Sequence, residues 1–356
     1  MSIGLQDKNL VFLISQPRAG STLLQRMLVA HPDIYTTSEP WLMLHPLYAL
    51  REAGIETEYN AGKALGGLRE FLSALPEGEQ AYWEALRRAF SYLYQRALTT
   101  ADKGLFLDKT PRYYFIIPEL YRLFPKAKFV FLLRNPLAVL ASILETWVKD
   151  KLQKLSNCRH DLLTAPSCIL QGIELLKEQA IVVHYEELVD RPELVLRDLC
   201  ERLGISFHVE MVEYGRHQAP AKWRYGDQGA AYQHTRPVPE LAGQWVEVLS
   251  RSQCWWQWAQ AYLQCLGPDM VLRMGYSYEE LEKTLASIGK RGRIVLVPWH
   301  LAIKPRQSRT FLENQRVFAL KLVMWLQRSL HHGGVWGTIR QGLHRLVPAA
   351  RRRSQR

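Results

Sequence analysis

The stretch QPRAGST near the N-terminus combines residue types that are suited to holding an anion: Arg18, Gly20, Ser21 and Thr22. It follows the apolar segment 10–14 and opens a predicted helix over 21–30. A turn at the start of a helix presents unpaired backbone N–H groups and the positive end of the helix dipole. The guanidinium and the two hydroxyls add donors that fit phosphate or sulfate oxygens. The stretch therefore predicts a phosphate-type loop, although an ordinary strand–turn–helix unit has the same short pattern.

This loop differs from one that binds a nucleoside triphosphate with magnesium. Such a loop reads GxxxxGK[ST], with Lys on the terminal phosphates and a hydroxyl on the metal. Here Gly20 replaces the Lys, and the later strand FVFLL is followed by Arg134 rather than by an Asp. The five cysteines include no CxxC pair and no metal-ligand spacing. We expect a metal-free site for a donor whose transferred group carries little charge, such as a sulfonate.

A second candidate anion contact lies in RNPLAVLAS. Arg134 stands at the end of a predicted strand, and Ser142 stands on the helix that follows. Because the carboxyl ends of parallel strands meet at one edge of a sheet, both side chains can converge there on one anion. The alternatives are an Arg that is paired to a carboxylate and an ordinary helix Ser.

Apolar segments alternate with helical patterns along most of the chain. Strands are predicted at 10–14, 105–108, 129–133 and 180–188, and helices at 21–30, 79–98, 118–124, 136–149, 192–204 and 252–266. This alternation predicts an α/β fold in which a parallel sheet is flanked by helices. The spacing in the 79–98 helix predicts a core-facing stripe of Trp83, Leu86, Phe90, Leu93 and Ala97.

The net charge of +12 is unevenly distributed along the chain. Of 46 Lys and Arg and 34 Asp and Glu, 16 basic residues and one acidic residue lie in 283–356, which leaves 30 and 33 in 1–282. We therefore predict a near-neutral domain over 1–282 and a basic helical C-terminal extension over 283–356. The charge of the domain gives no reason to expect a nucleic-acid partner.

The extension combines basic residues with tryptophans and the apolar segment VFALKLVMWL at 317–326. This segment is too short to span a bilayer, but basic flanks and Trp-bearing apolar helices suit an anionic membrane surface. Peripheral attachment is the favoured hypothesis, with a helical pair packed on the domain or a nucleic-acid-binding tail as alternatives. A chain truncated after Leu285 that still sedimented with anionic vesicles would contradict it. The N-terminus has no basic segment before its first apolar run, which predicts a cytoplasmic protein on the inner membrane face.

Two of these segments together resemble a known enzyme family. QPRAGSTLL and LLRNPLAVLASIL are similar to the donor-binding segments of sulfotransferases that use 3′-phosphoadenosine 5′-phosphosulfate (PAPS). HYEELVDRPELVLRDLCERLGI and PVPELAGQW…LGPDMVLRMGY resemble the same family, so the resemblance covers roughly residues 9–278. Arg18, in place of the Lys of cytosolic members, resembles the branch with protein-tyrosine, carbohydrate and many bacterial sulfotransferases. The resemblance implies the sulfotransferase fold, with PAPS as the donor and without a metal.

Donor-binding roles follow from the resemblance. It implies that the loop holds the 5′-phosphosulfate and that Arg134 and Ser142 hold the 3′-phosphate. Tyr185 would lie against the adenine, with a core tyrosine on a buried strand as the alternative, and Arg236 would lie near the donor's phosphates. The loop residues so implied are Arg18, Ala19, Gly20, Ser21 and Thr22.

The resemblance also implies the catalytic groups of an in-line transfer. Glu39, in SEPW, matches the base that takes the acceptor proton, although the sequence alone favours a solvated or helix-capping Glu. Lys109, in DKTPRY, and Arg18 would stabilise charge on the leaving oxygen. The alternative for Lys109 is a surface Lys. His45 is a weaker rival base, and His31, in AHPD, is interpreted as structural.

The acceptor is expected to be a hydroxyl-bearing small molecule, a glycan or a lipid. Its pocket is predicted in the least regular segments, 40–60, 145–170 and 215–235, because their aromatic and apolar side chains suit such compounds. These side chains are Trp41, Met43, Tyr48, Trp147, Trp223, Tyr225 and Tyr232. Two other functions stay open: a small-molecule kinase that uses ATP and magnesium, and a non-catalytic module that binds a nucleotide or a membrane.

Overall fold

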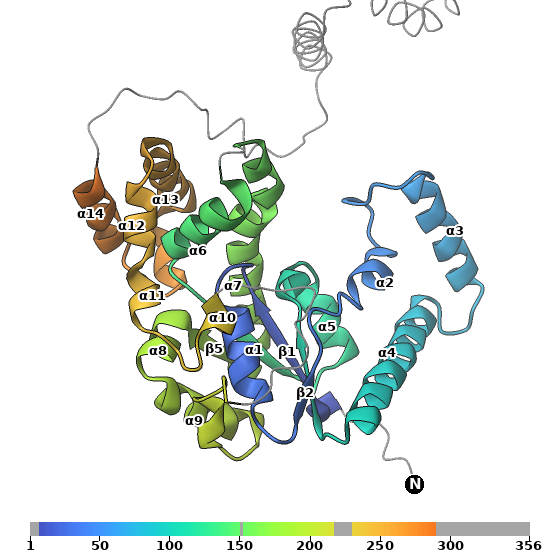
Figure 1. Cartoon of the computed structure of the whole chain (residues 1–356). Coiled ribbons are helices and arrows are strands. Elements are labelled where there is room, and N and C mark those ends of the chain that lie inside the picture. The colour runs from blue at the N-terminus through green and yellow to red at the C-terminus, as the bar shows by residue number, and fades with distance from the viewer. Residues whose placement is uncertain (1–6, 150–151, 217–229, 290–356) are drawn as a thin grey trace, which may run out of the picture. The chain divides into compact units, whose positions relative to one another are not determined.

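A parallel sheet of five strands, in the order β2-β3-β1-β4-β5, lies at the centre of the computed structural model (Figure 1). The strands are β1 (Leu10–Ser15), β2 (Ile34–Thr36), β3 (Leu105–Lys109), β4 (Lys128–Leu133) and β5 (Ala180–His184). The α/β fold with a parallel sheet that the sequence predicts is confirmed, and the short edge strand β2 is an addition to it. The structure describes residues 7–149, 152–216 and 230–289.

Helices cover both faces of the sheet. One face carries α1 (Ser21–Val29), α8 (Tyr185–Asp190) and α9 (Pro192–Leu203). The other face carries α4 (Glu79–Ala101), α5 (Ile117–Leu123) and α7 (Ala165–Leu176). A third group has its own hydrophobic cluster: α6 (Pro136–Ile143), α12 (Trp245–Ser250), α13 (Gln253–Arg273) and α14 (Tyr278–Ile288). The shorter or more peripheral helices are α2 (Leu44–Tyr48), α3 (Ala61–Ser73), α10 (Ala230–Gln233) and α11 (Glu240–Gly243).

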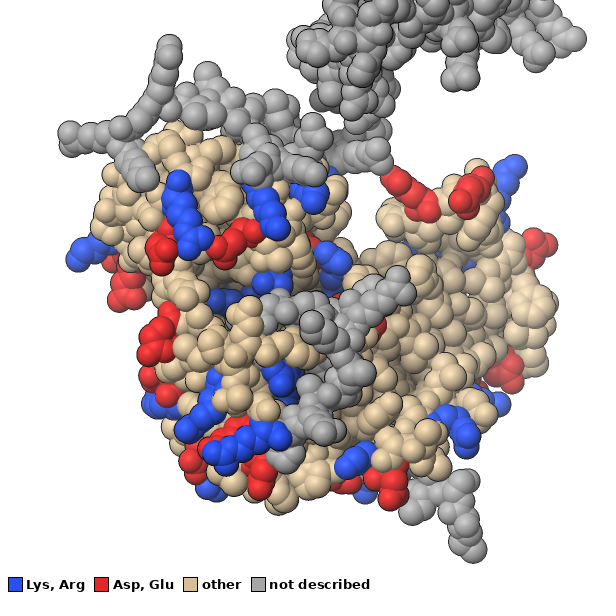
Figure 2. Space-filling view, in the orientation of Figure 1, with Lys and Arg blue, Asp and Glu red and all other residues tan. Residues whose placement is uncertain are grey.

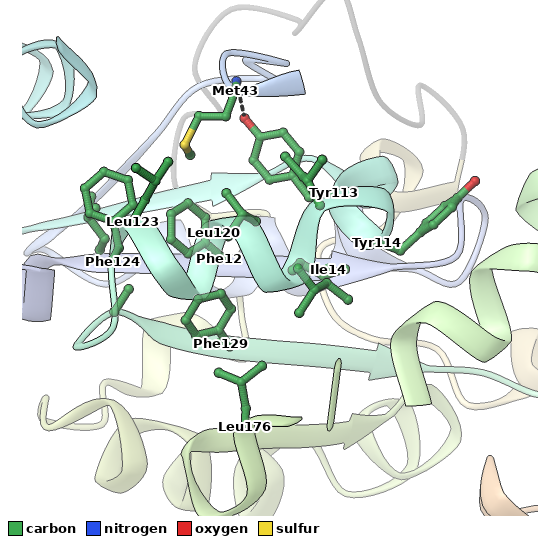
Figure 3. Packing of buried hydrophobic residues seen from close by; sticks show 14 of the residues in the cluster. Phe12, Ile14, Met43, Tyr113, Tyr114, Leu120, Leu123, Phe124, Phe129 and Leu176 are labelled. Atoms are coloured by element: carbon green, nitrogen blue, oxygen red, sulfur yellow. Dashed lines mark hydrogen bonds between the residues drawn. The ribbon is translucent and has the colours of Figure 1, made fainter. Parts of the chain in front are cut away.

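The central strand β1 is apolar from Leu10 to Ile14 because both of its faces are covered. Phe12 packs on Phe129 of β4, with 5.3 Å between the ring centroids, and on Phe124 after α5, at 6.0 Å (Figure 3). Val11 and Leu13 point to the opposite face and join the cluster under α1. Burial on both faces explains the continuous apolar run from which the strand was predicted.

Helix α4 confirms the predicted 79–98 helix, but one position of its predicted stripe is wrong. Phe90 is buried as expected, whereas Leu93 is 45% exposed. Tyr94 and Leu98 are buried in its place. The core accommodates the tyrosine because its hydroxyl donates a hydrogen bond to Asp108 at 2.6 Å. The predicted stripe missed Tyr94 because it was built from the most apolar residue types, and tyrosine carries a polar hydroxyl.

The predicted boundary between residues 282 and 283 falls inside α14. Leu281 and Leu285 of this helix are both buried in the cluster with α12 and α13. The rest of the extension lies outside the described residues, so the membrane-attached tail stays a prediction. In the described part of the chain, none of the helices has the length and apolarity needed to cross a bilayer. On the face shown in Figure 2, cationic and anionic side chains are interspersed over this part.

Asp108 is a carboxyl group buried in the core at the end of β3, with 1% of its surface exposed. Its oxygens accept hydrogen bonds from the hydroxyls of Tyr94 (2.6 Å), Thr110 (2.9 Å) and Tyr113 (3.2 Å). Burial raises the pKa of Asp108 to about 6 from an ordinary value of 3.8, against the opposing effect of these bonds. The folded protein therefore holds a proton here that the unfolded chain releases at lower pH.

This carboxyl should make part of the stability of the protein pH-dependent. Between pH 4 and 6 the folded state binds more protons at Asp108, so its contribution to the free energy of unfolding decreases as the pH rises. The rise in the pKa of Asp108 corresponds to a difference of on the order of 3 kcal/mol in the free energy of unfolding. Asp108→Asn, which keeps an acceptor for the tyrosines, should gain stability relative to the native protein from pH 4.5 to 7. Urea unfolding of both proteins at several pH values measures this, and parallel pH profiles would contradict it.

Candidate active site

The carboxyl ends of four strands lead directly to predicted site residues. β1 continues into the loop before α1, β3 ends at Lys109, β4 is followed by Arg134, and β5 is followed by Tyr185. Since these strands are parallel neighbours, the residues lie at one edge of the sheet. Tyr185 is the first residue of α8, so the prediction of a strand through residue 188 was wrong.

A cavity of about 400 Å³ opens at this edge. Most of the predicted site residues line it: Arg18, Gly20, Ser21, Thr22, Glu39, Arg134, Ser142, Tyr185 and Arg236. Ala19 and Lys109 are buried and do not line the cavity. Most of the site residues predicted from separate segments of the sequence therefore border one cavity.

The loop between β1 and α1 needs an unusual backbone. Arg18 has φ 72° and Gly20 has φ 100°, a left-handed conformation that glycine adopts without strain. A Cβ atom on Gly20 would lie 2.4 Å from Cδ2 of Tyr185. Gly20 therefore serves two purposes: it makes the turn into the helix, and it lets the tyrosine ring lie against the loop backbone.

A methyl group at this position should disturb the loop. Gly20→Ala would combine a strained φ with a contact that forces the Tyr185 ring to move. We expect affinity for 3′-phosphoadenosine 5′-phosphate to fall at least ~10-fold, because the ring and the loop both border the cavity. Calorimetry measures the loss, and Gly66→Ala, on α3 with open space around it, is the matched control. Unchanged affinity in Gly20→Ala would contradict this account of the loop.

The two predicted anion-binding segments are in direct contact. Nε of Arg18 donates a hydrogen bond to Oγ of Ser142 at 3.0 Å. Nη1 of Arg134 donates to the backbone carbonyl of Arg18 at 3.1 Å. The guanidinium of Arg134 also stacks on the ring of Tyr185, 4.0 Å from its centroid. Residues far apart in the sequence thus form one continuous cationic wall.

Arg134 has a donor that the described residues do not use. Its Nε is buried, and no residue in the described part of the chain accepts its hydrogen. A buried N–H group without an acceptor is costly, and a phosphate oxygen is a favourable partner for a guanidinium. The wall therefore fits a ligand that carries a phosphate group.

Glu39 stands on the same cavity with both carboxylate oxygens held. Oε1 accepts a hydrogen bond from Nζ of Lys109 at 2.8 Å, and Oε2 accepts one from Nε1 of Trp41 at 3.2 Å. The side chain of Lys109 is 0% exposed and that of Glu39 is 13% exposed. The surface-Lys alternative is therefore excluded, and the solvated-Glu alternative does not describe this carboxylate.

The segment that carries Glu39 is tied to the core behind it. The hydroxyl of Tyr113 accepts a hydrogen bond from the backbone N–H of Met43 at 3.2 Å (Figure 3). The same hydroxyl donates to buried Asp108. Trp41, between Glu39 and Met43, has φ 54°. This chain of contacts fixes the backbone that aims the carboxylate at the cavity.

Neither histidine near this region borders the cavity. His45 is exposed on α2, so it does not compete with Glu39 by position. His31 is buried, and its ring nitrogens contact the carbonyl of Ser206 at 3.0 Å and the N–H of Asp33 at 3.1 Å. Burial, together with neighbouring His208, lowers the pKa of His31. The structural interpretation of His31 is confirmed.

The structure brings some of the side chains predicted for the acceptor pocket to the cavity. Trp41 and Trp147 line the cavity. Met43 is buried in the core, Tyr48 stacks on Arg51, and Tyr232 stacks on Arg26. Trp223 and Tyr225 lie outside the described residues. Lining residues that the sequence analysis missed include Arg112, Tyr214, His234, Gln244 and Trp245.

Arg112 is the most consequential of the missed residues. Its Nε and Nη2 donate to Oδ1 and Oδ2 of Asp161 at 2.9 and 2.7 Å, which raises the pKa of Arg112. Its guanidinium lies 5.5 Å from the ring of Trp41 and 5.9 Å from that of Trp147. The segment DKTPRY contains this arginine, so the last charged residue of that segment was a signal in the sequence that could have identified it. Nothing in the sequence around Asp161 marks the partner.

Within residues 7–149, 152–216 and 230–289, no group of three or more His, Cys, Asp or Glu is arranged to hold a metal ion.

The chain is similar to proteins of known families. A family model described as "Sulfotransferase family" matches residues 11–209. Nodulation protein NoeE of Sinorhizobium fredii (strain NBRC 101917 / NGR234) is 30% identical over 313 residues, which are 80% of this chain and 70% of that protein. Protein-tyrosine sulfotransferase 2 of Gallus gallus is 28% identical over 207 residues, 57% of this chain and 53% of that protein. The solved sulfotransferase domain of the Synechococcus PCC 7002 olefin synthase matches with a TM-score of 0.44 at 26% identity, over 69% of this chain and 90% of that domain.

Proposed function

The chain belongs to the sulfotransferase family, and from this membership and the cavity we propose that it transfers a sulfuryl group from PAPS to an acceptor hydroxyl. The observation that carries the proposal is the contact between the two anion-binding segments. Arg18 bonds to Ser142 at 3.0 Å and accepts from Arg134 at 3.1 Å, on the cavity that Glu39 also lines. A donor with a phosphosulfate and a separate phosphate needs two such segments side by side.

On this proposal the donor is bound by groups that already face the cavity. The N–H groups at the start of α1, with Arg18, Ser21 and Thr22, bind the 5′-phosphosulfate. Arg134 and Ser142 bind the 3′-phosphate, which gives the buried Nε of Arg134 an acceptor. Tyr185 contacts the adenine, and Arg236, exposed on the lining of the cavity, adds positive charge.

The donor supplies a sulfur atom that forms a bond to the acceptor oxygen as its bond to the 5′-phosphate oxygen breaks. Glu39 takes the proton of the acceptor hydroxyl, and Lys109 and Trp41 orient its carboxylate for this. Arg18 stabilises the charge that develops on the leaving oxygen. Lys109 bonds to Glu39, so the one role predicted for it, on the leaving oxygen, requires it to change partner.

Calorimetry with three nucleotides, without metal, tests the donor. We expect 3′-phosphoadenosine 5′-phosphate to bind at least ~10-fold more tightly than adenosine 5′-phosphate or ATP, because only it reaches both segments. Equal binding of the three, or tight ATP binding that requires magnesium, would favour the kinase alternative. The family match gives that alternative no support. The acceptor stays open among a hydroxyl-bearing small molecule, a glycan and a lipid.

A further inference from the structure

A second, shallower hollow adjoins the cavity, and we call it the acceptor hollow. It is lined by Arg112, Thr146, Trp147, Lys154, Asn157 and Cys158. Arg112, Thr146 and Trp147 line the cavity as well. The two spaces therefore border the same three residues, and the acceptor hollow adjoins the cavity that Glu39 lines.

Two of the three guanidinium nitrogens of Arg112 bond to Asp161, and the third does not. Asp161, 2% exposed, takes Nε and Nη2 in a two-pronged ion pair. The hydroxyl of Tyr114 donates to the same carboxylate at 2.8 Å, and Nε2 of Gln16 donates to the backbone carbonyl of Asp161 at 2.9 Å. These contacts fix the guanidinium plane. Nη1 takes no part in the pair, on a side chain that lines both spaces, so it can donate to a ligand in a defined direction.

Two short π-helical segments build this wall. Leu144–Val148 follows α6 and carries Thr146 and Trp147. His160–Thr164 precedes α7 and carries Asp161. A π-helical turn adds a residue to the helix and re-aims the side chains around it, and such turns are frequent at functional sites. The backbone irregularity on both sides of Arg112 is therefore concentrated where the hollow lies.

The charge of the acceptor hollow is positive. Asp161 compensates Arg112, and Lys154 is exposed and forms no ion pair with another described residue. None of the described residues that line the hollow is Asp or Glu. The nearby carboxylates on the cavity are engaged, since Glu39 pairs with Lys109 at 2.8 Å and Glu145 pairs with Arg251 at 2.6 Å. A neutral acceptor would leave this positive wall without a partner.

We propose that the acceptor hollow binds an oxyanion that the acceptor carries beside its reacting hydroxyl: a carboxylate, phosphate or sulfate group. This inference rests on the proposed function and specifies its acceptor class. Arg112 supplies a directed donor, Lys154 supplies charge, and the indole of Trp147 supplies a flat surface for the carbon skeleton. Arg112 and Glu39 both contact Trp41, so the donor for the oxyanion and the proposed base adjoin the same indole ring.

Two matched phenols test the proposal on the full chain saturated with 3′-phosphoadenosine 5′-phosphate, which fills the donor side. The probes are 4-hydroxyphenylacetate and its uncharged amide, 4-hydroxyphenylacetamide. Calorimetry should show the carboxylate binding at least ~10-fold more tightly, since hydrogen bonds to charged groups are worth more than neutral ones. This preference should fall below ~3-fold in Lys154→Gln and in Arg112→Lys. The Lys variant keeps a cation on buried Asp161, and Lys154→Gln changes no buried group, so both should fold.

Lys149→Gln is the matched control, because Lys149 is exposed, close in sequence and outside the hollow. It should keep the preference for the carboxylate. If the nucleotide binds but the two phenols bind equally, or neither binds, the inference is overturned and the proposed function stands. A preference lost equally in Lys149→Gln would reduce the effect to general surface charge and also overturn it. Failure of the nucleotide itself to bind would overturn the proposed function and this inference together.

Discussion

Glu39→Gln should lower the rate of sulfuryl transfer by roughly 10²–10⁴-fold while leaving the affinity for 3′-phosphoadenosine 5′-phosphate unchanged. The amide has nearly the shape of the carboxylate but does not accept the acceptor's proton. Glu39 lies on the cavity with Lys109 and Trp41 on its two oxygens, so the substitution removes a base without opening a space. Initial rates of transfer of radiolabelled sulfate to any hydroxyl compound that the native chain sulfates measure the effect.

A second carboxylate provides the matched control. Glu119 also pairs with a cation, Arg51, at 2.7 Å and is also largely covered, but it does not line the cavity. Glu119→Gln should keep the rate within about twofold, because a partly exposed ion pair outside the cavity contributes little. Full activity in Glu39→Gln would assign the base elsewhere. Equal losses in both variants would indicate a general effect of removing a carboxylate.

Arg134→Met should weaken binding of 3′-phosphoadenosine 5′-phosphate by on the order of 10²-fold and change that of adenosine 5′-phosphate by less than ~3-fold. The guanidinium lies beside the loop, with an unsatisfied buried Nε, and we assign it to the 3′-phosphate. Methionine keeps an apolar contact with the Tyr185 ring, so the loss should report the charged contact and not the stacking. Calorimetry on both nucleotides gives the ratio.

The chain offers a control with the same kind of stacking away from the cavity. Arg197, on α9, lies 4.2 Å from the ring centroid of Phe207, much as Arg134 lies 4.0 Å from that of Tyr185. Arg197→Met should leave both nucleotide affinities unchanged. If Arg134→Met weakened the two nucleotides equally, the arginine would act on the shared 5′-phosphate or on the loop, and its assignment would have to change.

The side of the cavity that we assign to the donor could be predicted because its signals are local. A buried strand, a small turn and a helix are contiguous in the sequence, and Arg134 directly follows another strand. The parallel topology of the sheet then brings these two segments together, because it places the carboxyl ends of neighbouring strands side by side. The contact of Arg18 with both Arg134 and Ser142 is the result of that rule.

The acceptor side could not be predicted in the same way because its partners are chosen by tertiary packing. Arg112 and Asp161 come from separate segments. These segments meet only when α7 and residues 160–164 before it pack against residues 111–116, which follow β3. The π-helical turns that aim Trp147 and carry Asp161 have no sequence signature. The same reasoning explains the misplaced stripe of α4, where a hydrogen bond to Asp108 decided that Tyr94 is buried.

The strand order also sets an order of assembly. β1 is made first, but its neighbours are β3 and β4, and the register pairs Val11 with Lys128. At a synthesis rate of roughly 5–20 residues per second, this separation corresponds to on the order of 10 s. Until residues 105–109 of β3 are made, the most apolar strand of the sheet has neither flanking partner. The loop between β1 and α1 is thus among the first parts to be synthesised and among the last to reach its final surroundings, because its walls come from strands made later.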